Sequence, residues 1–121
     1  ADLEQTEFAI EEFGRIKATY IEQKVNSMFP DHIKFKMFNV QINGGIDETC
    51  EALIDGVPFD TANNAARINA GISIINVLCK HHNVYAPIFV DNAEAVTSVL
   101  DSDSQMILLY VDEEFKTLNI E

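Results

Sequence analysis

Cysteine, proline, glycine and basic side chains are scarce in this chain of 121 residues, and tryptophan is absent. The two cysteines, Cys50 and Cys79, are too few for the disulfide framework of a small secreted domain. Both have apolar neighbours, so we expect buried free thiols and a reducing, cytoplasmic location. Three prolines and five glycines are too few for a collagen-like or low-complexity chain.

Positive charge and long apolar runs are also in short supply. Eight Lys and Arg against 20 Asp and Glu give a formal net charge of −12. Such an acidic surface repels phosphate backbones, so we do not expect this segment alone to bind nucleic acid. The longest stretch without charge lies between Arg67 and Lys80. It is shorter than the roughly 20 apolar residues that span a membrane, so we expect no membrane partner.

The first half of the chain has clear periodic patterns. Residues 2–28 predict a long amphipathic helix, which Pro30 ends. Residues 33–42 and 47–54 alternate between apolar and polar side chains, and Asn43-Gly44-Gly45 lies between them, which predicts a β-hairpin. The apolar positions of the helix recur at steps of three and four: Ile10, Phe13, Ile16, Tyr20, Ile21, Val25 and Met28.

The second half predicts a buried helix over residues 61–80, capped by Asp60 or Thr61. Short apolar runs over 86–90 and 105–111 predict buried strands, with a helix over 93–100 between them and an edge strand over 115–120. The fold class is therefore α/β with a partly parallel sheet. Four amides on the buried helix need polar partners, which are either local groups, a ligand or a second protein surface: Asn63, Asn64, Asn69 and Asn76.

The place where chemistry is most plausible is the end of the strand at Val90-Asp91. Ligands of open α/β sheets bind beyond the carboxyl ends of strands. A carboxylate such as Asp91 suits Mg²⁺, and a second one nearby, such as Glu94, can deprotonate an attacking water. The structural alternative is that Asp91 only caps the helix expected from Ala93. The adjacent His81 and His82 point about 100° apart on a helix, so they are unsuited to sharing one metal ion.

The stretch from Ile42 to Val111 resembles the C-terminal end of large ATPases of the structural-maintenance-of-chromosomes (SMC) type, in particular phage relatives of the DNA-repair exonuclease ATPase subunit. The resemblance rests on residues 42–45, 48–59, 65–78 and 86–97. It implies the C-terminal α/β lobe of an ABC-type head over residues 31–121. Residues 1–30 would be the end of a coiled-coil arm. The chain would then be a fragment, as its start at Ala1 also suggests.

The resemblance also implies roles for individual residues. Ile88-Phe89-Val90-Asp91 matches the Walker B strand, so Asp91 would help to hold Mg²⁺. The next position, usually a catalytic Glu, is Asn92, and the resemblance implies that Glu94 and Asn92 would be the catalytic residues that serve the attacking water. The turn of Asn63, Asn64 and Ala65 stands where the signature motif would meet the γ-phosphate of ATP bound to a second head. The usual Leu-Ser-Gly-Gly and the switch His are absent.

The chain contains no GxxxxGK[ST] phosphate loop. The resemblance therefore implies that ATP and Mg²⁺ bind only together with the N-terminal lobe of the same ATPase, which pairs with a second head as a homodimer and contacts DNA through the parent assembly. The isolated segment is not expected to hydrolyse ATP. The alternative is a small acidic phage module without catalytic activity, which dimerises through residues 2–28 and sequesters a basic protein partner.

Overall fold

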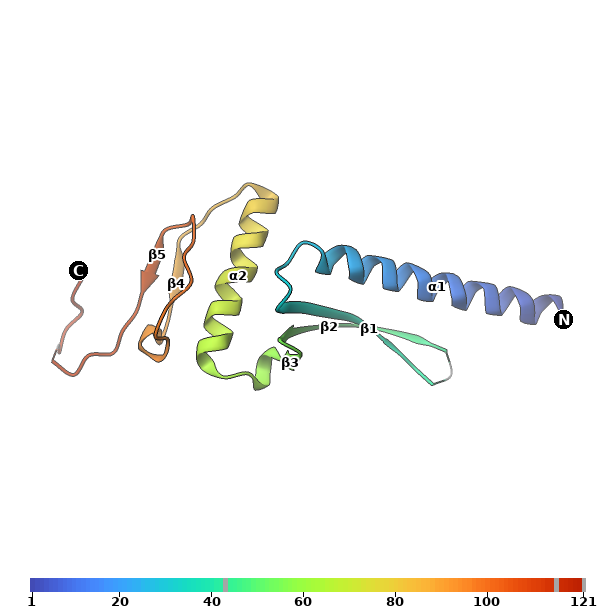
Figure 1. Cartoon of the computed structure of the whole chain (residues 1–121), viewed down its shortest axis with the longest axis horizontal. Coiled ribbons are helices and arrows are strands. Elements are labelled where there is room, and N and C mark those ends of the chain that lie inside the picture. Colours follow the sequence, from blue (N-terminus) through green and yellow to red (C-terminus); the bar gives the residue numbers. More distant parts are fainter. Residues whose placement is uncertain (43, 115, 121) are drawn as a thin grey trace. The chain divides into compact units, whose positions relative to one another are not determined.

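The computed structural model describes residues 1–42, 44–114 and 116–120, and in this part the chain has mixed α/β structure (Figure 1). Contacts divide the chain into two compact units, Ala1–Ala62 and Asn63–Glu121. The first unit contains helix α1 (Asp2–Asn26) and an antiparallel sheet, and the second contains helix α2 (Asn64–His82) and a parallel strand pair. The division expected after residue 30 differs from this one, because α1 contacts the first strand of the hairpin.

The sheet of the first unit confirms the predicted hairpin. Strand β1 (Ile33–Val40) pairs antiparallel with β2 (Ile46–Ile54), and the short β3 (Val57–Pro58) adds to the end of β2. The register shifts between Lys36 and Phe38, which marks a bulge. In the connection Gly44 has a φ of +86°, a conformation that glycine adopts easily, whereas Asn43 of the predicted turn lies outside the described residues.

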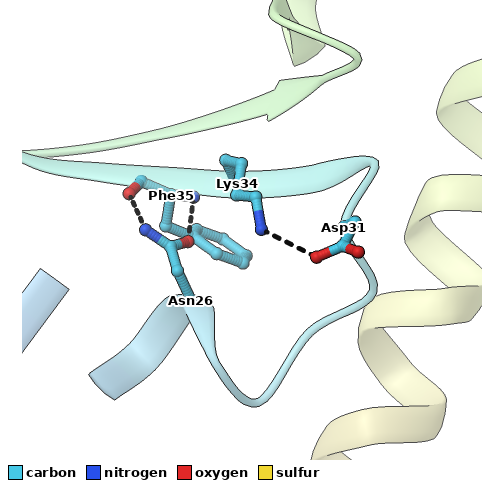
Figure 2. A network of polar contacts seen from close by, with 4 residues as sticks. All are labelled: Asn26, Asp31, Lys34 and Phe35. Atoms are coloured by element: carbon cyan, nitrogen blue, oxygen red, sulfur yellow. Dashed lines mark hydrogen bonds and ion pairs between the residues drawn. The ribbon is translucent and has the colours of Figure 1, made fainter. Parts of the chain in front are cut away.

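Side chains of α1 close part of the outer edge of β1 (Figure 2). The Asn26 Oδ1 accepts from the Phe35 backbone N–H at 2.7 Å, and the Asn26 Nδ2 donates to the Phe35 carbonyl at 2.9 Å. One turn earlier, a carboxylate oxygen of Glu22 accepts from the Met37 N–H at 2.8 Å. A free strand edge carries unpaired backbone groups that can recruit another strand. Here two helix side chains take the place of a neighbouring strand.

The long N-terminal helix forms as predicted, but its apolar residues do not share one buried face. Ala18 is buried and Ile21 and Val25 are half-buried, whereas Phe13 and Tyr20 stay 68% and 58% exposed. The reason is angular, since each residue turns the helix by about 100° and the seven apolar positions cover more than one side. The small sheet covers only one of these sides.

Helix α2 begins later than predicted. Asn63 is its N-cap, and the Asn63 Oδ1 accepts from the Ala66 N–H at 2.8 Å. The predicted caps Asp60 and Thr61 are wrong, because they belong to a preceding 3-10 turn (Phe59–Thr61). The Thr61 hydroxyl donates to the Pro58 carbonyl at 3.0 Å and is therefore used inside that turn.

The second unit has a small but contiguous core. Strands β4 (Ile88–Val90) and β5 (Met106–Leu108) pair in parallel, as predicted, though both are shorter than expected. Phe89 on the opposite face is 67% exposed, so the prediction of a strand buried on both faces is wrong. The core consists of buried residues and the half-buried side chains against them: Ile72, Ile88, Val90 and Ala93 with Ile68, Val99, Met106 and Leu108.

Two predicted elements are not found. The helix expected over 93–100 is only a 3-10 turn (Ala93–Ala95) followed by an irregular crossover to β5, because the Leu100 N–H donates to the Asn69 side chain and not to a helical carbonyl. The edge strand expected over 115–120 is absent from 116–120, while Phe115 lies outside the described residues. Cys50 is exposed and Cys79 half-buried, so the prediction of two buried thiols is also wrong.

None of the helices, over the residues described, is both long and apolar enough to cross a membrane.

Candidate functional site

The predicted Mg²⁺ ligand lies at the carboxyl edge of the parallel strand pair. Asp91 follows directly on β4 and is exposed. Its Oδ1 accepts from the Asn92 backbone N–H at 2.9 Å, which closes a tight local turn. Because β4 and β5 run in parallel, their carboxyl ends meet at this edge, where α/β sheets bind ligands.

Backbone hydrogen bonds to Leu109 hold the turn at both of its ends. The Leu109 N–H donates to the Val90 carbonyl at 2.9 Å, and the Leu109 carbonyl accepts from the Ala93 N–H at 3.1 Å. Ala93 itself is 1% exposed and belongs to the core. The two residues between these anchors, Asp91 and Asn92, are therefore presented to solvent on a fixed backbone.

Asn92 adopts the left-handed conformation, with φ 59° and ψ 39°. This region is costly for most residues with a Cβ, and asparagine and aspartate tolerate it best. The geometry thus gives Asn92 a backbone role, independent of any chemistry of its side chain. Asn92 is the N-cap residue of the 3-10 turn that follows, but its side chain makes no cap hydrogen bond. Asp91 does not occupy the cap position, so the interpretation of Asp91 as a helix cap is wrong.

Glu94 lies in the 3-10 turn after Asn92 and is exposed. It follows three residues behind Asp91 on a segment whose ends are fixed by Ala93 and Val96, because the Val96 N–H donates to the Ala93 carbonyl at 3.1 Å. Both carboxylates therefore belong to one short, well-anchored loop. A carboxylate can bind a hard cation, and it can also accept a proton from a water molecule.

The other predicted ligand group lies at the start of α2. The Asn63 Oδ1 caps the helix by accepting from the Ala66 N–H, which leaves the Nδ2 group of this side chain as the donor that could meet an anion. Asn64 and Ala65 are the first residues of the helix, where backbone N–H groups lack carbonyl partners within the helix and can meet an anion. Among the described residues, no hydrogen bond joins this turn to Asp91 or Glu94.

The two remaining amides of α2 bind the crossover. Asn69 donates to the Ser98 carbonyl at 3.1 Å and accepts from the Leu100 N–H at 2.9 Å. Two turns further along the same face of α2, Asn76 donates to the Asp101 carbonyl at 2.9 Å and accepts from the Ser102 hydroxyl at 2.5 Å. The sequence predicted that these amides need polar partners, and groups of the crossover in the same unit are those partners. Which backbone they would bind was not visible.

The rest of the second unit offers no stronger site. A shallow cavity of about 290 Å³ lies beside Asn76, Lys80, Tyr85 and Ser102, and neither Asp91 nor Glu94 lines it. Within residues 1–42, 44–114 and 116–120 there is no group of three or more His, Cys, Asp or Glu side chains that could hold a metal ion unaided. A cation at Asp91 therefore needs oxygen ligands from elsewhere, such as phosphate groups and water.

Comparisons of this chain with protein-family models, with curated proteins and with solved structures found no match.

Proposed function

We propose that this chain is the C-terminal lobe of a phage-type SMC-like ATPase head that acts in DNA repair or recombination. The observation that carries the proposal is the position of Asp91, which stands exposed on an anchored turn directly after a parallel strand. The strand and the aspartate are the residues that resemble a Walker B segment, Ile88-Phe89-Val90-Asp91.

In this proposal Asp91 would hold Mg²⁺, which would offset the negative charge of the ATP phosphates. Glu94 accepts a proton from the water that attacks the γ-phosphorus, and ADP leaves with the electron pair of the broken P–O bond. Asn92 cannot be the base, because an amide does not accept a proton at neutral pH. Its part is to shape the turn that carries both carboxylates.

The exposed face of the pair of β4 and β5 supports the proposal that another lobe of the ATPase packs against it. Parallel sheets are usually covered on both faces, yet Phe89 is 67% exposed. An N-terminal lobe of the same ATPase would cover this face and bring the phosphate loop that the present sequence lacks. A second head would meet the start of α2 at Asn63, Asn64 and Ala65, where the backbone N–H groups of Asn64 and Ala65 lack carbonyl partners within the helix.

The experiment is ATP turnover by the protein that joins this chain to the N-terminal lobe with the phosphate loop. We expect Asp91→Ala and Glu94→Gln each to lower kcat by about 100-fold or more. Raising the Mg²⁺ concentration should partly restore Asp91→Ala, because that variant binds the metal weakly. It should not restore Glu94→Gln, which has lost the base.

Asp60→Ala and Glu113→Gln are the matched controls, since both residues are exposed and neither belongs to the β4 turn. Both controls should keep wild-type turnover. Wild-type turnover in Glu94→Gln would remove Glu94 from the mechanism. A parent protein without a phosphate loop, or one that shows no turnover, would refute the ATPase proposal as a whole.

The second candidate is the acidic binding module without catalytic activity, and one observation favours it. α1 leaves large apolar side chains exposed along much of its length, as a dimerisation or docking helix does. A basic protein that binds the chain tightly without ATP, with an affinity that falls as salt rises, would support this candidate. Binding that survives high salt unchanged would argue against partner capture by charge.

A further inference from the structure

α1 carries a row of exposed apolar side chains, which we call the α1 stripe: Leu3, Ile10, Phe13, Ile16 and Tyr20. Each of the five is between 58% and 83% exposed. Their sequence steps of seven, three, three and four place them within an arc of about 140° on one side of the helix. A row of this length is unusual on a surface that meets only water.

The stripe lies on a different side of α1 from the one that its own unit uses. Glu22 and Asn26 bind the backbone of β1, and Ala18, one turn before Glu22, is 8% exposed. A shallow hollow of about 320 Å³ runs beside Ile16 and Tyr20 on the stripe itself. The stripe therefore offers both apolar ridges and a place for a side chain to enter.

The charges along α1 are divided between its two halves. Residues 2–13 carry five acidic side chains and no basic one, whereas residues 14–26 carry Arg15, Lys17 and Lys24 against the single acid Glu22. Two such helices side by side in parallel would set acid against acid. Placed antiparallel, each acidic half faces the basic half of the other copy, and the helix dipoles also oppose favourably.

We propose that α1 of one chain pairs antiparallel with α1 of a second copy through the α1 stripe. Phe13 stands near the middle of the helix, which runs from Asp2 to Asn26, so the two-fold axis passes close to it. In this arrangement Ile10 meets Phe13 of the other copy, and Leu3 meets the hollow beside Tyr20. One patch serves both partners, as two-fold symmetry requires.

The pairing involves only α1 and needs no nucleotide. In the proposed ATPase, α1 is the end of a coiled-coil arm, and the inference states which helix it pairs with. The same pairing is compatible with the binding module. The test of the pairing contains no ATP, so a negative result would not change the conclusion drawn from ATP turnover. Lost turnover would equally leave the helix pairing untouched.

The test is sedimentation of the 121-residue chain without nucleotide over a range of about 1 to 200 μM, where pairs of modest affinity dissociate and form. We expect a dimer for the wild type and a monomer for Phe13→Glu, with association weakened about 10-fold or more. Phe8→Glu is the matched control. Phe8 is 69% exposed on the same helix, but it points away from the α1 stripe, so this variant should dimerise like the wild type.

A wild-type chain that stays monomeric at the highest concentration would overturn the proposal and assign the stripe to a different helix. A dimer that persists in Phe13→Glu would also overturn it, because the copies would then meet elsewhere. Circular dichroism confirms that each variant keeps its helix. Ile10→Glu replaces Phe13→Glu if the latter does not fold.

Orientation is tested by disulfide formation in a Cys50→Ser, Cys79→Ser background. A mixture of Leu3→Cys and Tyr20→Cys chains should cross-link, because these positions face each other in the antiparallel pair. Leu3→Cys chains alone should not cross-link. Efficient cross-linking of Leu3→Cys to itself would mean a parallel pair and would refute the proposed arrangement.

Discussion

The two units use asparagine side chains in the same way, but they differ in how much apolar surface they bury. In the first unit Asn26 binds the backbone of β1, and in the second Asn69 and Asn76 bind the crossover. Among the described residues, those buried in the first unit are Ala18, Ile33 and Ile54, whereas the second unit buries Ala70, Ile72, Ile88, Val90 and Ala93. The second unit thus has a core, and the first depends more on its polar contacts.

This difference teaches how a helix can be held without a large apolar face. α1 sits on its sheet through two side chains that replace missing strand hydrogen bonds. Large apolar side chains of α1 therefore stay exposed, and five of them form the α1 stripe. α2 instead buries Ile72 against β4, and its amides only fix the loop that covers the sheet.

The sharpest test of the comparison is Ile72→Ala. Ile72 is 3% exposed in the core of the second unit, so its truncation should cost about 2–5 kcal/mol of unfolding free energy. Urea denaturation followed by circular dichroism measures this loss. Ile75→Ala on the same helix, where the side chain is 37% exposed, should cost less than about 1 kcal/mol. Equal losses in the two variants would show that the second unit has no specific core.

The second test removes the polar contact of the first unit. Asn26→Ala leaves the N–H and carbonyl of Phe35 without their side-chain partner, which should cost about 1–3 kcal/mol. Asn26→Asp keeps an acceptor for the N–H and should lose less. Hydrogen exchange at the Phe35 amide should accelerate in Asn26→Ala. Gln23→Ala, at an exposed position of the same helix, should leave that exchange rate unchanged.

A third test concerns the start of α2, where sequence and structure disagree about the cap. Asn63→Ala should destabilise the second unit by about 1 kcal/mol, because the Ala66 N–H loses its partner. Thermal unfolding reads out this change. Thr61→Ala should have the smaller effect, since Thr61 bonds only within the preceding turn. The reverse order would restore the cap predicted from the sequence.

The smallest effect is expected for the ion pair between Lys34 and Asp31, which Figure 2 shows beside the Asn26 contact. The Nζ and Oδ1 atoms are 3.5 Å apart, and the Asp31 side chain is fully exposed. Lys34→Gln should therefore change stability by no more than about 0.5 kcal/mol. A loss as large as that of Asn26→Ala would mean that charge, rather than backbone pairing, holds this corner.

Periodic patterns predicted most of the regular elements, because a helix or a strand repeats its environment along the chain. The hairpin and both long helices follow from such repeats, whereas the strands β4 and β5 follow from short apolar runs without alternation. The segment 93–100 has helical composition but is irregular, since Asn69 captures the Leu100 N–H from 31 residues away. No local pattern can anticipate a bond across that separation.

The candidate site divides in the same way. Asp91 was placed at a strand end by pattern alone, and the structure confirms that position. The two Leu109 backbone hydrogen bonds that hold the turn could not be predicted from the sequence, because they depend on which strand lies next to β4. The split of the α1 apolar residues into a buried and an exposed side was also missed, since periodicity says that a helix has an apolar face but not how wide a surface will cover it.

Asn92 is one of three residues with a Cβ that take a left-handed backbone in the described chain, together with Asp55 after β2 and Asn83 after α2. Asp55 and Asn83 directly follow an element, Asn92 directly precedes the 3-10 turn, and each is the kind of residue for which this conformation costs least. In evolutionary terms these positions should exchange among Asn, Asp and Gly and resist longer or branched residues. A glutamate at position 92 would thus be disfavoured by backbone geometry before any chemistry is considered. In the proposed ATPase, the carboxylate that serves the attacking water would therefore have to stand at another position of the loop.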